Sequence, residues 1–275
     1  MSLEVTSLAS GSSGNALLIQ RDGIAILIDC GVSQRAIERQ LRLVGVEPAG
    51  LTAIILTHEH GDHSYSAGPL ARRWKLPVVC NGPTRAMLRD ELDGVTVEEL
   101  PERGRLQIGP FEINSFALRH DAAAPVGYLI DDGVHRVGIA IDLGSWDMHT
   151  AEALQPADLI VLEANHDRER LRASPYPRSL QHRIMGPLGH LDNVQAGELL
   201  TKVAADGRAR DVWLAHLSEQ ANSPEIATRV VRTTVQMAGI ASLRVAALPR
   251  KQSKRWSSDR MMVQTSLFGD EGLSV

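Results

Sequence analysis

The sequence predicts an α/β (α+β) fold in which two β-sheets are covered by helices. The first half of the chain contains short apolar or alternating runs separated by turns rich in glycine, serine and asparagine. The second half alternates short apolar runs with longer segments of helical periodicity. Strands mixed with helices through long connections are typical of sheets packed between helices. The 275 residues suffice for one large domain or two small ones, and no internal repeat is present.

The first half of the chain is expected to form mostly strands. Residues 34–44 are an exception, because their apolar side chains recur at helical spacing, and a second helix is expected at about residues 69–74. Residues 51–56 predict a buried strand that leads directly to His58. The other strands are expected at residues 3–8, 16–19, 24–28, 78–79, 111–118, 128–130 and 137–141.

The second half of the chain is expected to alternate strands and helices. A helix is expected at residues 194–205, with Asp192 or Asn193 as its N-cap. Another is expected at residues 224–238, where Ser223 precedes a proline in the first helical position. The strands of this half are expected at residues 159–162, 212–215 and 243–246.

Composition excludes several classes of protein. Apolar residues make up 43% of the chain and charged residues 23%, as in ordinary globular proteins. The formal net charge is −4, so no global basic field indicates nucleic-acid binding, and any site for a polyanion must be local. The chain has two cysteines, no recognisable signal peptide and no apolar run of about 18 residues. We therefore expect a cytoplasmic protein without disulfides or membrane spans.

Four residues of metal-binding type follow the buried strand in the first half. His58 and His60 lie two positions apart, so in an extended chain their side chains point the same way. Asp62 and His63 follow Gly61, which we expect to allow a sharp turn of the backbone. One pair can then face one metal ion and the other pair a second. Borderline divalent metals prefer imidazole and carboxylate ligands; the alternative is a polar loop with chance histidines.

Three further candidate ligands lie at the ends of expected strands. His120, Asp142 and His216 each occur at the carboxyl end of such a strand, where functional loops leave a scaffold. Each also has a simpler interpretation, the histidines as surface residues and Asp142 as part of a turn. Together with the cluster, they provide the number of ligands that two metal sites need.

This set of residues resembles the metallo-β-lactamase superfamily across residues 1 to about 248. The resemblance rests on Asp29, the motif at residues 57–63 and the three later ligands in order. It implies an αββα sandwich with two divalent metal ions, zinc or manganese, at one rim of the sheets. It also implies the ligand sets, which are His58, His60 and His120 for one ion and Asp62, His63 and His216 for the other, bridged by Asp142. Asp29 would hold the loop of residues 58–63 in place from the side away from the metal ions.

The histidine at position 60 distinguishes branches within the superfamily. The redox-active di-iron branch has glutamate there, so His60 favours a hydrolytic branch. Further motifs resemble the YycJ/WalJ-like subfamily, whose members are associated with 5′-to-3′ exonuclease action on DNA. Asp192 departs from its pattern, which has serine at this place, so the chain lacks a hydroxyl that the pattern provides for a phosphate contact. The motifs are residues 10–16, 120–122, 127–128, 163–167, 189–193 and 214–219.

The candidate catalytic residues are Asp62, His190 and Glu163. A likeness to RNA-processing phosphodiesterases of the superfamily implies that His190 is a general acid or binds the scissile phosphate, paired with Glu163. The alternative for His190 is a structural role at the start of a helix. In the expected mechanism a metal-bridging hydroxide is the nucleophile, Asp62 orients it and His190 helps the leaving oxygen depart.

The candidate substrate-binding residues are His166, Asn193, Ser218 and Arg183. Arg183 belongs to a segment in which cations and aromatic rings occur together, a combination that suits single strands or strand ends. The alternative is a solvated charged loop, since acidic residues lie among the basic ones. The other members of this segment are Arg168, Arg170, Arg172, Tyr176, Arg178 and His182.

The character of the chain changes after residue 248. We expect a hydrolase domain at residues 1–248 and a basic, polar tail at residues 249–275. Residues 264–268 of this tail resemble the short peptide with which bacterial repair and replication proteins dock on the sliding clamp. Gln264, Leu267 and Phe268 would carry the contact, and Thr265 replaces a leucine of the pattern. The alternative is that Leu267 and Phe268 pack on the domain.

Three functions follow from these patterns. The leading hypothesis is a dinuclear phosphodiesterase, a 5′-to-3′ DNA exonuclease of DNA repair. The second is a hydrolase of a small thioester, lactone or cyclic phosphodiester. The third is a nucleic-acid-binding regulatory protein with a structural metal site, which the ligand set disfavours because structural sites lack an open position for water.

Overall fold

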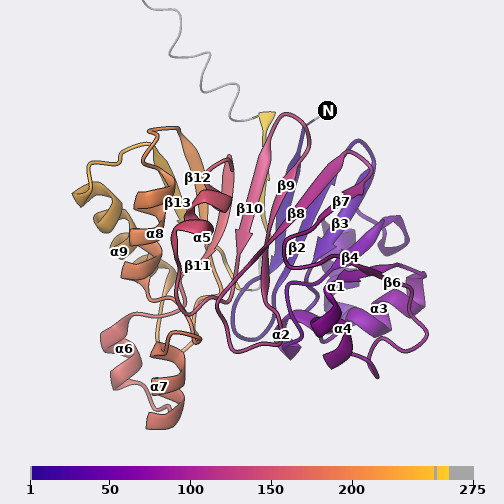
Figure 1. Cartoon of the computed structure of the whole chain (residues 1–275), viewed down its shortest axis with the longest axis horizontal. Coiled ribbons are helices and arrows are strands. Elements are labelled where there is room, and N and C mark those ends of the chain that lie inside the picture. The colour runs from indigo at the N-terminus through magenta and orange to yellow at the C-terminus, as the bar shows by residue number, and fades with distance from the viewer. Residues whose placement is uncertain (1, 251–252, 260–275) are drawn as a thin grey trace, which may run out of the picture.

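The computed structural model describes residues 2–250 and 253–259, and it has four layers in the order helix, sheet, sheet, helix (Figure 1). Two β-sheets stack face to face, and helices cover the outer face of each sheet. This arrangement confirms the αββα sandwich that the sequence predicts. No helix in the described part of the chain is long and apolar enough to cross a membrane.

The first sheet has seven strands among the described residues. In spatial order they are β14 (Lys254–Ser257), β1 (Glu4–Ala9), β2 (Ala16–Arg21), β3 (Ile24–Ile28), β4 (Ala53–Ile55), β5 (Val78–Cys80) and β6 (Val97–Glu99). The strands from β14 to β3 are antiparallel, whereas β3 to β6 are parallel. Strand β14 lies within the segment expected as a tail. Its buried Trp256 pairs with Val5 and joins the core, although the charged residues around it hide this contact in the sequence.

The second sheet likewise has seven strands in the described part of the chain. In spatial order they are β13 (Leu243–Ala247), β12 (Arg210–Ala215), β11 (Leu159–Glu163), β10 (Arg136–Ala140), β9 (Val126–Asp131), β8 (Phe111–Ala117) and β7 (Arg105–Ile108). Strands β10 to β13 are parallel, while β7 to β10 form an antiparallel meander. Parallel strands end at the same edge, so the loops that follow them gather at one rim of the sandwich.

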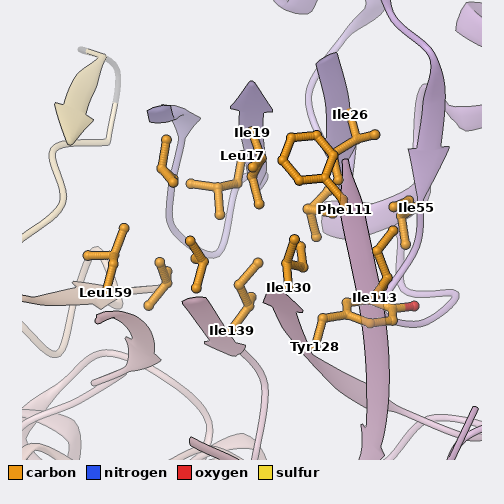
Figure 2. Close-up of a cluster of buried hydrophobic side chains, with 14 of the residues drawn as sticks. Leu17, Ile19, Ile26, Ile55, Phe111, Ile113, Tyr128, Ile130, Ile139 and Leu159 are labelled. Atoms are coloured by element: carbon orange, nitrogen blue, oxygen red, sulfur yellow. The ribbon is translucent and has the colours of Figure 1, made fainter. Parts of the chain in front are cut away.

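The main core fills the space between the two sheets. Figure 2 shows apolar side chains of the first sheet, such as Ile19 and Ile26, pointing toward those of the second, such as Ile130 and Ile139. The hydroxyl of Tyr128, on β9, crosses this layer and donates to the carbonyl of Leu56, 2.6 Å away. That hydrogen bond ties the second sheet to the strand end that leads into the His58–His63 motif.

Helices pack on the outer faces of both sheets through amphipathic stripes. Helices α1 (Gln34–Leu43) and α3 (Ala67–Trp74) cover the first sheet, while α5 (Met148–Leu154), α8 (Asn193–Val203) and α9 (Pro224–Met237) cover the second (Figure 1). Asp192 is the N-cap of α8 in a capping box with Gln195, and Ser223 caps α9, as the sequence predicts.

Several short elements lie outside the sequence predictions, because a few residues carry too little periodicity to identify them. The helical ones are α5 and, besides it, η1 (Pro48–Gly50), α2 (Gly61–Ser64), α4 (Gly82–Met87), α6 (Arg168–Ala173) and α7 (Arg178–Met185). Figure 1 shows α6 and α7 projecting beyond the sandwich, and α2 at the same end of the sheets. Gln264, Leu267 and Phe268, the predicted clamp-binding residues, lie outside the described residues.

Candidate metal centre

All seven predicted ligands lie at the rim where the parallel strands end. His58 and His60 occupy the loop after β4, and Asp62 and His63 belong to the short helix α2 that follows. The other three come from the second sheet, and they are His120 after β8, Asp142 after β10 and His216 after β12. Residues more than 150 positions apart in the chain therefore meet at one place.

Three residues of this rim have a left-handed backbone conformation. Asp29, Asp142 and His216 have φ angles of 59°, 61° and 54°. For a residue other than glycine this conformation costs on the order of 1 kcal/mol or more, and it persists only where the surroundings enforce it. Each of the three follows a strand end, so the turn aims its side chain into the rim.

The carboxylate of Asp142 lies at the centre of the group. Its Oδ2 atom is 3.3 Å from Nε2 of His58, 3.0 Å from Nε2 of His63 and 3.7 Å from Nε2 of His120. Its Oδ1 atom is 2.9 Å from Nδ1 of His216. Burial alone would raise the pKa of Asp142, but the imidazoles of His216 and His63 outweigh burial and hold that pKa well below its usual range. Asp142 is therefore an anion, as a bridging ligand must be.

Among the described residues, potential ligand atoms fall into three groups that share Asp142, and in each group the atoms lie within 4.8 Å of one another. Two of them contain the ligand sets that the family resemblance implies, with His58, His60, His120 and Asp142 in one group and Asp62, His63, Asp142 and His216 in the other. The third group is Asp142, Glu163, His190 and His216.

Asp29 lies behind the motif, where the resemblance predicts it. Its carboxylate accepts hydrogen bonds from the backbone N–H and the hydroxyl of Thr57, each 2.9 Å away. Its Oδ2 atom is also 2.7 Å from Nδ1 of His63. This carboxylate favours the tautomer of His63 with the proton on Nδ1, which leaves Nε2 free to bind a metal ion.

Two other histidines are oriented in the same way. Nδ1 of His120 is 2.8 Å from the carbonyl oxygen of Gly189, and Nδ1 of His216 is 3.0 Å from Oε1 of Glu163. An acceptor at Nδ1 again directs Nε2 to a metal ion. A set of histidines held at Nδ1 is typical of a metal site and uncommon in a chance polar loop.

The charges at the rim also fit divalent cations. Asp29, Asp62, Asp142 and Glu163 form ion pairs with histidines, and among the described residues no lysine or arginine forms a salt bridge with them. Buried carboxylates are costly unless cations neutralise them, and two divalent ions would neutralise four negative charges. Nε2 of His58 is buried, and no described residue forms a hydrogen bond with it. The residues present therefore fit a pair of divalent metal ions.

Glu163 and His190 lie together beside the ligand groups. Glu163 is fully buried, and its Oε1 atom is 2.7 Å from Nδ1 of His190. Its Oε2 atom accepts hydrogen bonds from the backbone N–H groups of Leu143 and Leu191. Glu163 is thus fixed by the loop after Asp142 and by the segment that carries His190.

The electrostatic surroundings of His190 suit a proton donor. Burial lowers the pKa of His190, but the carboxylates of Glu163 and Asp142 outweigh burial and raise it to about 9. The His190 side chain is 19% exposed, so it contacts both the buried carboxylates and solvent.

A cavity of about 260 Å³ opens onto the ligands. Five of them line it, namely His60, Asp62, His120, Asp142 and His216, together with His190. An open side distinguishes this arrangement from a closed structural metal site. A substrate in the cavity would contact both ligand groups.

The predicted substrate-binding residues divide into two pairs. Ser218 and Arg183 line the cavity, and Nε of Arg183 donates to Asp121 at 2.6 Å. His166 and Asn193 lie outside the cavity lining that the described residues form, and both are buried, each 1% exposed.

Asp192 takes part in local structure. Its side chain accepts the backbone N–H groups of Val194 and Gln195 and also pairs with Arg168. It therefore serves as the N-cap of α8, a role that serine can also fill. Arg168, which belongs to the basic segment, therefore forms an ion pair with Asp192.

The sharp turn expected at Gly61 is present, but it does not depend on glycine. Gly61 has no left-handed φ, and a Cβ atom there would meet open space. The turn comes instead from the start of α2, where the carbonyl of His60 accepts the N–H groups of His63 and Ser64. The close approach belongs to Gly31, where a Cβ atom would lie 1.6 Å from the carbonyl oxygen of Asp62.

Several residues of the site have no functional role predicted from the sequence. Leu180 and Ile184, on α7, line the cavity, as does Ser12, which belongs to the motif at residues 10–16. Thr57, in the motif at residues 57–63, holds Asp29 and contacts His58. The spacing of four residues between Leu180 and Ile184 is the signal that indicates the α7 contribution.

The stacked sheets and the histidine- and aspartate-rich rim define the class of αββα metallo-hydrolases. Residues 25–217 match the family model described as "Beta-lactamase superfamily domain", and the chain belongs to this family. The protein named exodeoxyribonuclease YycJ of Bacillus anthracis is 31% identical over 242 residues, which cover 87% of this chain and 91% of that protein. The exodeoxyribonuclease WalJ of Streptococcus pneumoniae (strain D39) is 34% identical over 225 residues, covering 80% and 83%.

A solved structure supports the fold over nearly the whole chain. The metallo-β-lactamase fold protein YhfI from Bacillus subtilis superimposes with a TM-score of 0.70 at 20% sequence identity. The match covers 93% of this chain and all of YhfI. At this identity the likeness establishes the shared fold.

Proposed function

We propose that this metal-dependent hydrolase is a phosphodiesterase that degrades DNA from the 5′ end and acts in DNA repair. The observation that carries the proposal is a cavity lined by both groups of ligand atoms and by His190. The relatives named exodeoxyribonuclease, which match most of the chain, support DNA as the substrate.

Two divalent ions, zinc or manganese, would be held by His58, His60 and His120 and by Asp62, His63 and His216, with Asp142 between them. When bound, such a pair supplies an activated water at neutral pH and neutralises charge on a phosphoryl oxygen. A phosphodiester benefits strongly, because it is already an anion before the reaction.

The protein's own side chains would orient and protonate the substrate. Asp62 lies on the cavity wall, where its carboxylate can accept a hydrogen bond from the attacking water. The His190 imidazole, whose Nδ1 atom lies 2.7 Å from Oε1 of Glu163, would donate a proton to the leaving oxygen. Glu163 acts through His190 as a positioning residue, and Arg183 and Ser218 bind phosphate oxygens on the cavity wall.

Two finer predictions from the sequence accompany this proposal. Docking on a sliding clamp through Gln264, Leu267 and Phe268 stays a prediction, as does a cytoplasmic location. The boundary between a domain at residues 1–248 and a tail likewise stays a proposal. Strand β14, which lies beyond this boundary, belongs to the first sheet.

The test is cleavage of end-labelled DNA by purified protein that has been stripped of metal and refilled with zinc or manganese. We expect the release of nucleotides from the 5′ end, lost on addition of a chelator. His60→Ala should lower the rate by about 1,000-fold or more, because it removes a ligand of the ion that activates water. This factor corresponds to about 4 kcal/mol of lost transition-state stabilisation. His60 is partly exposed, so the variant should keep the circular dichroism spectrum of the wild type.

The same preparation should be assayed on a thioester and a lactone. Turnover of either compound without cleavage of DNA would contradict the proposal and identify a small-molecule hydrolase. Undiminished DNA cleavage by metal-free His60→Ala would contradict the role of the metal centre.

A further inference from the structure

One wall of the cavity is an apolar stripe that belongs to no core. Leu180 and Ile184 lie four residues apart on one face of α7, and Tyr176 precedes this helix, next to its N-cap Pro177. All three line the cavity and are half-buried, and none is part of the three hydrophobic clusters of the described residues. Helix α7 has no fully buried side chain and projects from the sandwich (Figure 1). The apolar face of α7 is therefore directed to the cavity and not to a hydrophobic core.

The position of this wall is fixed relative to the reacting groups. The carbonyl of Ile184, near the end of α7, accepts the N–H of His190 at 2.9 Å. Gly189 lies against the same helix end, where a Cβ atom would be 2.2 Å from the carbonyl oxygen of Arg183. The Gly189 carbonyl in turn lies 2.8 Å from Nδ1 of His120. One short segment thus joins the apolar wall to a predicted ligand and to the predicted proton donor.

The remaining lining of the cavity is polar. Ser12, Asn165 and Ser218 supply hydroxyl and amide groups, and Asp121 pairs with Arg183. The metal-binding atoms come from the five predicted ligands that line the cavity, His60, Asp62, His120, Asp142 and His216. A ligand that fills the cavity must have an apolar part next to a phosphate-like part. At about 260 Å³ the cavity is smaller than the roughly 300–1,000 Å³ of common ligand pockets, so it accommodates one nucleotide unit and excludes a stretch of duplex.

We propose that Tyr176, Leu180 and Ile184 bind the terminal nucleobase of the DNA and so position its phosphodiester at the metal centre. The inference rests on the proposed function and adds a specificity subsite to it. Every nucleobase has an apolar face, so stacking on aromatic or apolar side chains tolerates any DNA sequence. Arg183, on the same helix and also at the cavity, lies where it can contact the phosphate. The enzyme should therefore require a base at the end it degrades but should not select which base.

The test compares a normal 5′-terminal nucleotide with an abasic one. We expect wild-type protein to have a KM about 10-fold higher for the abasic end, in line with the known size of base stacking. Leu180→Ala should raise KM for the normal end by about 10-fold and leave the abasic end unchanged, with kcat little affected. Ser179→Ala, on the same helix but exposed and away from the cavity lining, is the matched control and should behave as wild type.

A binding measurement decides the question independently of DNA cleavage. Calorimetry on the metal-loaded protein should give an affinity for thymidine 5′-monophosphate about 10-fold higher than for deoxyribose 5-phosphate, and Leu180→Ala should abolish this difference. Equal affinity for the two compounds in wild type would overturn the inference even if DNA is cleaved. If the protein does not cleave DNA, the proposed function fails, and a preference for the nucleotide would still support the subsite. Impaired turnover of an acyl thioester by Leu180→Ala, with no nucleotide preference, would assign the wall to an acyl chain.

Discussion

Gly31 allows the ligand helix α2 to lie close to the first sheet. The N–H of Cys30 donates to the carbonyl of His63 at 2.7 Å, so the backbone after β3 is hydrogen-bonded to the motif. A Cβ atom at Gly31 would lie 1.6 Å from the carbonyl oxygen of Asp62 and 2.7 Å from the nitrogen of His63. Backbone atoms cannot yield as a flexible side chain can, so any substitution must displace the ligands.

Gly31→Ala and Gly61→Ala form a matched pair at the residue scale. We expect Gly31→Ala to lower metal affinity by about 10- to 100-fold, the usual effect of disturbing the support of a metal ligand. Gly61→Ala should bind metal as the wild type does, because a Cβ atom there meets open space. Titration of the metal-stripped proteins with zinc measures both, and equal affinity in the two variants would refute the packing argument.

Strand β12, which leads to His216, begins at a fully buried arginine. The guanidinium of Arg210 donates to the carbonyls of Gln155 and Ala157, just after helix α5, and pairs with Asp206 at 2.6 Å. Cations are favourable at the carboxyl ends of helices, where carbonyls lack partners. This one side chain therefore joins α5 to the strand that carries a predicted ligand.

At the element scale we expect Arg210→Met to lower the free energy of unfolding by about 1.5–3 kcal/mol, because it leaves the carbonyl of the buried Ala157 without this donor and removes partly buried hydrogen bonds to Gln155 and Asp206. Arg208→Met is the control, since Arg208 is 45% exposed and its pair with Asp158 should contribute less than about 1 kcal/mol. Urea denaturation of both variants gives the two values. Equal destabilisation by the two substitutions would contradict the buried role of Arg210.

For the whole molecule, the sequence predicts the sandwich and the approach of the metal ligands better than it predicts helices α6 and α7. The sandwich and the approach of His120, Asp142 and His216 to the motif follow from strands that end in ligand-type residues, and the family resemblance supplies their order. Helices α6 and α7 are missed because each has eight residues or fewer, and the apolar positions of α7 face the cavity. The roles of individual side chains depend on distances such as those around Glu163, which no spacing in the sequence encodes.

We propose that seven side chains from both sheets hold two divalent ions. The most direct test is the metal content of refilled and desalted protein, measured by mass spectrometry against a variant in which Asp142, the shared residue of both groups, is changed to asparagine. We predict about two zinc or manganese ions per wild-type chain, since a structure with two open sites of three or more ligands binds two ions. The variant should retain fewer. Wild-type protein that retains no more metal than the variant would contradict the account.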